Sequence, residues 1–246
     1  MVSDKGYRIQ EHTGNPAHPS VDTSCWQYDH CVYANPHQSS LERQYARSDA
    51  NKEIGLPTTD TMMRVGAIHS LDVDDFDPEE KSLEVVYRPE TDTPIKNSTD
   101  GERFIALSDE VCQLLIDWID QRRPASVDKH GREPLITTSQ GRAHTTTLRG
   151  DCYRYTQPCI RSGECPHGRD IDDCPATDYE RASECPLSES PHALRRGGIT
   201  NSLQQDWPMK AVGDRANVSE QVLEMHYNQR TEKEKMEQRR DYLDRL

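Results

Sequence analysis

A histidine and an arginine three residues apart, His192 and Arg195, are the clearest candidates for chemistry in this sequence. Pro191 suits the first position of a helix, and on such a helix the two side chains lie one turn apart on the same face. The planar guanidinium of arginine holds two phosphate oxygens at once, and histidine donates a hydrogen bond or moves a proton near neutral pH. The pair therefore favours a phosphate group as its ligand, although such a pair also occurs by chance on helix surfaces.

A tyrosine follows on a second predicted helix, in the sequence VLEMHYNQR over residues 222–230. Helical spacing places Val222, Leu223, His226 and Tyr227 on one face. Taken alone, this face is typical of core packing rather than of a reactive tyrosine.

Four segments, taken in order, resemble the tyrosine recombinase or phage integrase family. They are MMRVGAIHSLDVDD around Arg64, IKNSTDGERFIAL after Lys96, PHALRRG with the histidine–arginine pair, and HYNQRT with Tyr227. That family's catalytic domain uses an arginine at the start of a helix, a lysine on a β-hairpin, an HxxR motif and a nucleophilic tyrosine. The resemblance covers residues 60–230 and implies the family's catalytic-domain fold, which is mainly α with a small antiparallel β-sheet (α+β).

The resemblance also implies a reaction, in which duplex DNA is broken at a specific site and rejoined through a 3′-phosphotyrosine link. Arg64 and Arg195 would hold the scissile phosphate, and Tyr227 would attack it. His192 or the arginines would favour loss of the tyrosine proton, and Lys96 would protonate the leaving 5′-oxygen. The chemistry needs no cofactor, and the expected partners are double-stranded DNA and further copies of the chain on that DNA.

Three departures from the family pattern support a rival interpretation. The acidic residue expected three positions after the first arginine is Ala67, and Asp214 stands where a histidine or tryptophan is expected. Residues 1–58 are too short and aperiodic for the family's N-terminal helical DNA clamp. The rival is a truncated or decayed integrase that binds DNA or a partner without cutting, whereas a hydrolase has no motif of its own here. The role of the residue at 214 stays unassigned.

A polar segment over residues 159–186 contains a cluster of cysteines, which we treat as an insertion in the catalytic domain. The candidate metal ligands are Cys159, Cys165, Cys174 and Cys185. Their spacing is wider than that of a standard zinc ribbon, so a structural zinc ion and free thiols are equally consistent with it.

The expected elements follow from apolar spacing and capping residues. The helices are expected at 62–71, 108–124 with Ser108 as N-cap, 147–156, 191–207 and in three stretches after Pro208, and the strands at 83–89, 103–107 and 133–138. Residues 1–58 form a predicted irregular segment and 59–246 the catalytic domain. Gly197 and Gly198 would let another helix or a DNA backbone approach closely.

The composition is acidic and weakly hydrophobic. Asp and Glu outnumber Lys and Arg by 43 to 30, the formal charge is −13, and the mean hydropathy is −0.96. Such a charge fits poorly with DNA unless the cytoplasm is salt-rich, as in haloarchaea, and the cations gather on one face. With no apolar run of about 18 residues and no signal-peptide pattern, we expect a cytoplasmic protein without membrane contact.

Overall fold

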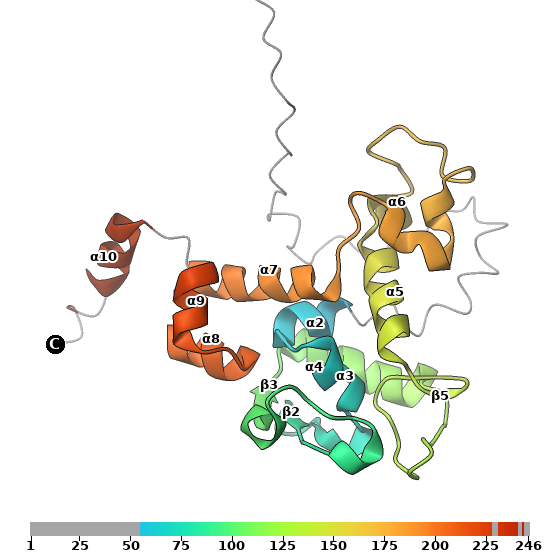
Figure 1. The fold of residues 1–246 in the computed structure, drawn as a ribbon, viewed down its shortest axis with the longest axis horizontal. Coiled ribbons are helices and arrows are strands. Elements are labelled where there is room, and N and C mark those ends of the chain that lie inside the picture. The colour runs from blue at the N-terminus through green and yellow to red at the C-terminus, as the bar shows by residue number, and fades with distance from the viewer. Residues whose placement is uncertain (1–54, 228–230, 241–242, 244–246) are drawn as a thin grey trace, which may run out of the picture. The chain divides into compact units, whose positions relative to one another are not determined.

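The computed structural model describes residues 55–227, 231–240 and 243. Helices predominate in this part of the chain, and two small antiparallel sheets accompany them, as Figure 1 shows. The predicted mainly α fold with a small antiparallel sheet is therefore confirmed. The predicted irregular segment lies mostly outside the described residues, but its last residues, from Gly55 onward, are helical. The prediction is wrong for those residues.

The first two described helices are α2, Gly55–Thr61, and α3, Val65–Ser70. The short buried helix predicted from the apolar spacing at 62–71 is confirmed as α3, but it begins only at Val65, so Met62 and Met63 lie outside it. Met62 has a left-handed backbone with φ 54°, which ends α2 and separates it from α3. The apolar spacing is nevertheless meaningful, because Met63, Ile68 and Leu71 are all buried in the main core.

The larger sheet has the strand order β1-β2-β3, with β1 at Phe76–Asp77, β2 at Ser82–Val85 and β3 at Arg103–Ala106. Its registers pair Leu83 with Ile105 and Val85 with Arg103. The predicted hairpin with a long loop is confirmed, whereas the two-residue strand β1 is too short to show a periodicity in the sequence.

The predicted helix at 108–124 is confirmed as α4, Asp109–Asp117, followed by a π-helical turn at Trp118–Arg122. Ser108 is its N-cap, because the hydroxyl accepts a hydrogen bond from the Val111 amide at 3.4 Å. The smaller sheet follows with β4, Thr137–Thr138, and β5, Gly141–Arg142. The predicted helix at 147–156 is confirmed as α5, Thr145–Thr156.

A buried ionic network joins the segment after α3 to the residues between 128 and 142. Asp72 lies 2.5 Å from guanidinium nitrogens of both Arg132 and Arg142, and Arg142 also reaches Asp128 at 2.8 Å. Because breaking a buried pair leaves one charge without its partner, loss of any one of these side chains would destabilise the contact between β5, the preceding loop and the turn after α3.

The cysteine-containing segment packs against α5. It includes α6, Pro158–Ser162, and short 3-10 helices at Pro175–Thr177 and Tyr179–Glu184. The buried Gln157 amide donates to the carbonyls of Ala176 and Ala182, both at 2.9 Å, and the Tyr179 hydroxyl donates to Asp151 at 3.0 Å. These contacts join the segment to α5 and to the residue that follows it.

The C-terminal part consists of α7, Pro191–Gln204, α8, Met209–Ala216, α9, Glu220–His226, and α10, Glu232–Arg240. These helices confirm the predicted elements. Helix α7 runs across α2 (Figure 1), and a Cβ atom at Gly198 would overlap the Thr59 carbonyl. The close approach expected of the glycines is therefore made to α2 by Gly198, whereas Gly197 has open space beside it. Within the described ranges, none of the helices has the length and apolar character needed to span a bilayer.

Candidate functional site

Arg195 lies in the second turn of α7 and is only 2% exposed. Its guanidinium donates to two backbone carbonyls, that of Met62 and that of Ala216, the latter at 2.7 Å. The left-handed backbone of Met62 thus places a carbonyl where Arg195 can reach it. Burial, followed by the nearby Arg64, lowers the pKa of Arg195 to about 10. A phosphate anion at this point would offset the repulsion between the two guanidiniums.

Arg64 is the N-cap residue of α3 and is half-buried. Its Nη1 donates to the Asn217 carbonyl at 3.0 Å. Ala67, at the position where the family pattern has an acid, is buried in the main core. The support for Arg64 therefore comes from a backbone carbonyl of another helix end rather than from a carboxylate on its own helix.

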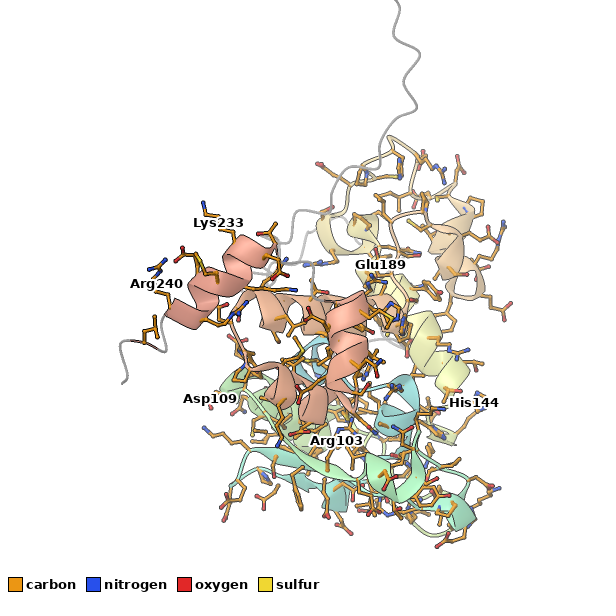
Figure 2. The ribbon with its side chains drawn as sticks, turned by 60° about the vertical axis from the view of Figure 1, so that its left-hand side comes forward. Arg103, Asp109, His144, Glu189, Lys233 and Arg240 are labelled. Atoms are coloured by element: carbon orange, nitrogen blue, oxygen red, sulfur yellow. The ribbon has the colours of Figure 1, made fainter. Side chains whose placement is uncertain are left out.

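Arg103, on β3, is a third arginine in this region and is half-buried, and no pattern in the sequence pointed to it. It donates through Nε to the Arg215 carbonyl at 2.9 Å and through Nη1 to the Gly101 carbonyl at 2.7 Å. Burial, followed by the positive charges of Arg64 and Arg215, lowers its pKa to about 10. Figure 2 shows Arg103 where the green strands meet the red C-terminal helices.

The three arginines share one acceptor, the C-terminal end of α8. The carbonyls of three consecutive residues, 215, 216 and 217, accept from Arg103, Arg195 and Arg64 respectively. The last carbonyls of a helix have no partner within the helix and carry its partial negative charge. They therefore favour the positive charge of guanidiniums that burial would otherwise destabilise. We call Arg64, Arg103 and Arg195 the arginine cluster.

Tyr227 ends α9 and is half-buried beside the arginine cluster. Its amide donates to the Leu223 carbonyl at 3.0 Å, and the Arg196 guanidinium lies 5.7 Å from the centre of its ring. Burial lowers the pKa of Arg64, and the nearby tyrosine opposes that change. The same opposition occurs at Arg195. Tyr227 also packs against the buried cluster that includes Met62 and Ala216, whose carbonyls bind Arg195. The predicted nucleophile therefore lies beside the residues that hold one of the predicted phosphate ligands.

Lys96 and His192 are exposed, unlike the arginine cluster. His192 lies in the first turn of α7, whose N-cap Ser190 accepts from the Ala193 amide at 3.2 Å. Lys96 lies in the loop before β3, and its carbonyl accepts from the Asn217 side chain at 3.4 Å. His192 is therefore on the same helix as Arg195, and the Lys96 loop contacts Asn217, whose carbonyl binds Arg64. Asp214 is also exposed, on α8, and among the residues that the structure describes no contact of its side chain assigns it a role.

Three of the four candidate zinc ligands begin turns of the same kind. Amides three residues later donate to the carbonyls of Cys165, Cys174 and Cys185, at 2.9, 3.0 and 3.1 Å, and each cysteine precedes a proline. Burial raises the pKa of the Cys159 thiol, and Cys185 and then Cys165 raise it further. Across 55–227 and 231–240, however, no three Cys, His, Asp or Glu side chains are close enough to share a metal ion.

Zinc binding in this segment stays a prediction, which metal analysis of the purified protein can test. We expect close to one zinc per chain, because a metal would stabilise the thiolate forms that mutual proximity now disfavours. Cys185→Ser should lower the zinc content, whereas Cys112→Ala, which changes a core thiol on α4, should not. Zinc-free protein with four titratable thiols in the segment would establish the alternative of free cysteines.

Comparison with known proteins yields matches among solved structures. The crystal structure of XerA recombinase aligns with a TM-score of 0.52 and 18% identity, covering 93% of this chain and 66% of that one. The Tn1549 transposon integrase aligns in complex with transposon right end DNA (TM-score 0.54, 16% identity) and with a circular intermediate DNA (0.55, 17%), covering 89% of this chain and 67% of the integrase. This chain thus spans about two thirds of their length. No protein-family model and no curated protein sequence matches it.

Proposed function

We propose that this chain, which has the tyrosine recombinase fold, is a site-specific DNA recombinase or integrase. The observation that carries the proposal is the position of Tyr227 at the end of α9, packed against the cluster that includes Met62 and Ala216, whose carbonyls hold Arg195. A nucleophile beside a buried arginine and a half-buried one suits attack on a phosphodiester, whose oxygens gather negative charge in the transition state.

The proposed reaction needs only side chains of the protein. The Tyr227 oxygen attacks phosphorus, the bond to the 5′-oxygen breaks, and a 3′-phosphotyrosyl link forms. The exposed His192 takes the phenolic proton, and Lys96 gives a proton to the departing 5′-oxygen. Attack by another 5′-hydroxyl reverses these steps, so rejoining conserves the ester and needs no ATP.

A nicked duplex library made from the genome that encodes the protein would test the proposal. When cleavage occurs beside a nick, the short fragment diffuses away, so the covalent complex cannot be religated and accumulates. We expect adducts that survive denaturing detergent and disappear on protease digestion. Binding of DNA without any adduct would instead favour the rival, a protein that occupies DNA or a partner without cutting it.

Duplex DNA and further copies of the chain on it are the proposed partners. The Tn1549 structures were determined in complex with DNA, which supports the first of these. Because breaking and rejoining two duplexes involves four strands, several copies would have to assemble on the DNA for a complete exchange.

A salt-rich working medium is the second element of the proposal. Acidic side chains line one face of the larger sheet, including Asp74, Asp77, Glu80 and Glu84. Arg103 and Arg195, in contrast, bind backbone carbonyls inside the protein. Repulsion across such a face weakens as salt shortens the screening length.

We therefore expect the free energy of unfolding to rise between about 0.1 M and about 2 M KCl, because the screening length falls from about 10 Å to a few ångströms. Urea denaturation followed by circular dichroism at the two salt concentrations would measure the change. Loss of structure in molar salt, with full activity in dilute buffer, would refute a halophilic origin of the acidic surface.

A further inference from the structure

We infer that Asn217 is a positioning residue that holds the Lys96 loop against the arginine cluster. The inference rests on the proposed function, since it concerns the delivery of a proton to the leaving 5′-oxygen. Asn217 follows α8 directly, in a left-handed conformation with φ 51° and ψ 60°.

Asn217 contacts both halves of the site at once. Its backbone carbonyl accepts from Arg64 at 3.0 Å. Its side-chain oxygen accepts from Asn97 Nδ2 at 3.0 Å, and its side-chain nitrogen donates to the Lys96 carbonyl at 3.4 Å. One residue therefore joins the residue that would hold the phosphate to the loop that would supply the proton.

The Lys96 loop has an unusual backbone that benefits from such a contact. Asn97 and Ser98 are both left-handed, with φ 72° and 52°, a conformation that costs most residues about 1–2 kcal/mol. The loop also folds tightly on itself, because a Cβ atom at Gly101 would overlap the Lys96 carbonyl and lie 3.1 Å from Asn217 Nδ2. The Lys96 side chain itself is exposed, so its direction depends on the backbone that carries it.

The chemistry of the contact explains why asparagine suits this position. Asparagine tolerates the left-handed region, and its amide both donates and accepts. Aspartate would accept from Asn97 but could not donate to the Lys96 carbonyl. Glycine would keep the backbone, and with it the carbonyl bonded to Arg64, while removing both side-chain contacts. Asn217→Gly thus separates the loop contact from the arginine contact.

The decisive experiment compares two leaving groups in one nicked duplex that carries a sequence cleaved by the wild-type protein. One substrate has the natural 5′-oxygen at the scissile bond, and the other has sulfur in its place. A thiolate leaves without being protonated, so the sulfur substrate does not need the proton from Lys96. Asn217→Gly should cleave the oxygen substrate about 10- to 100-fold more slowly, the loss expected for a misplaced general acid. It should cleave the sulfur substrate within about twofold of the wild-type rate, since the phosphate ligands are unchanged.

Two other variants frame this result. Lys96→Ala should show the same selective defect to a larger degree. Asn97→Gly keeps the left-handed backbone and removes the partner of the Asn217 oxygen, so its defect on the oxygen substrate should be smaller. This variant also provides a second test if Asn217→Gly folds poorly. Equal loss of both substrates in the two glycine variants would overturn the inference, as would an unchanged rate on the oxygen substrate. Wild-type protein that forms no adduct with either substrate would instead overturn the proposed function itself.

Discussion

Tyr227→Phe should abolish the covalent adduct with nicked DNA while leaving DNA affinity nearly unchanged. The substitution removes only the hydroxyl oxygen that would attack phosphorus, and the ring keeps its place at the end of α9, 5.7 Å from the Arg196 guanidinium. DNA affinity depends mainly on neutralised phosphates, so one hydroxyl contributes little to it. Denaturing gel electrophoresis would measure the adduct, and a mobility shift at fixed salt would measure binding.

Tyr153→Phe is the matched control, because it removes a tyrosine hydroxyl on α5, outside the arginine cluster. It should form adducts at the wild-type rate. Adducts that persist in Tyr227→Phe would assign the nucleophile to another tyrosine, and Tyr242, which lies outside the described residues, would be tested next. A loss of both adduct and binding would mean that Tyr227 supports the fold rather than the reaction.

The sequence predicted those parts of the site whose residues carry local signals. Pro191 begins α7 and Ser190 caps it, so the spacing of His192 and Arg195 on one helix could be read directly. Ser219 likewise caps α9 by accepting from the Val222 amide at 3.4 Å, which fixed the helix that leads to Tyr227. Capping and helical spacing depend on neighbours in the sequence, and this is why such features could be predicted.

Arg103 and Met62 had no comparable signal. Arg103 reads as an ordinary charged residue at the start of a strand, and only the fold brings the end of α8 to it. Met62 fits the apolar spacing of a continuous helix, and its left-handed backbone becomes intelligible only with Arg195 bound to its carbonyl. Both depend on partners more than a hundred positions away, which single-sequence patterns do not encode.

The departures from the family pattern also look different once the contacts are known. Ala67 removes an acid that would otherwise support Arg64, but the Asn217 carbonyl provides a support of another kind. A carbonyl carries only partial charge, so it holds the guanidinium without neutralising it. The full positive charge of Arg64 thus stays available to a phosphate, which weakens the argument that Ala67 marks a decayed enzyme.

Arg195→Lys should be nearly as damaging as loss of the tyrosine, and it should also destabilise the protein. The guanidinium binds two carbonyls on different elements, that of Met62 before α3 and that of Ala216 at the end of α8. A lysine ammonium cannot reproduce that planar arrangement. We expect cleavage to fall by about 10²- to 10³-fold, the usual effect of removing one transition-state donor.

The stability loss has a separate cause. The substitution would leave one carbonyl unsatisfied next to residue 195, which is only 2% exposed. The free energy of unfolding should therefore fall by about 1–3 kcal/mol. Urea denaturation would measure this loss, and cleavage assays below the transition would separate it from the catalytic effect. Arg149→Lys, an exposed arginine on α5, should change neither quantity.

The pH dependence of the lysine variant gives an independent check on why arginine stands at this position. Burial, followed by Arg64, lowers the pKa of Arg195 to about 10, which still leaves arginine charged near neutral pH. Lysine begins from about 10.4, so the same surroundings would bring its pKa closer to neutrality. Because the charged form prevails below the pKa, residual cleavage by Arg195→Lys should decline as pH rises, at pH values where the wild type shows no such decline. Wild-type cleavage by the variant across this range would remove Arg195 from the proposed phosphate ligands.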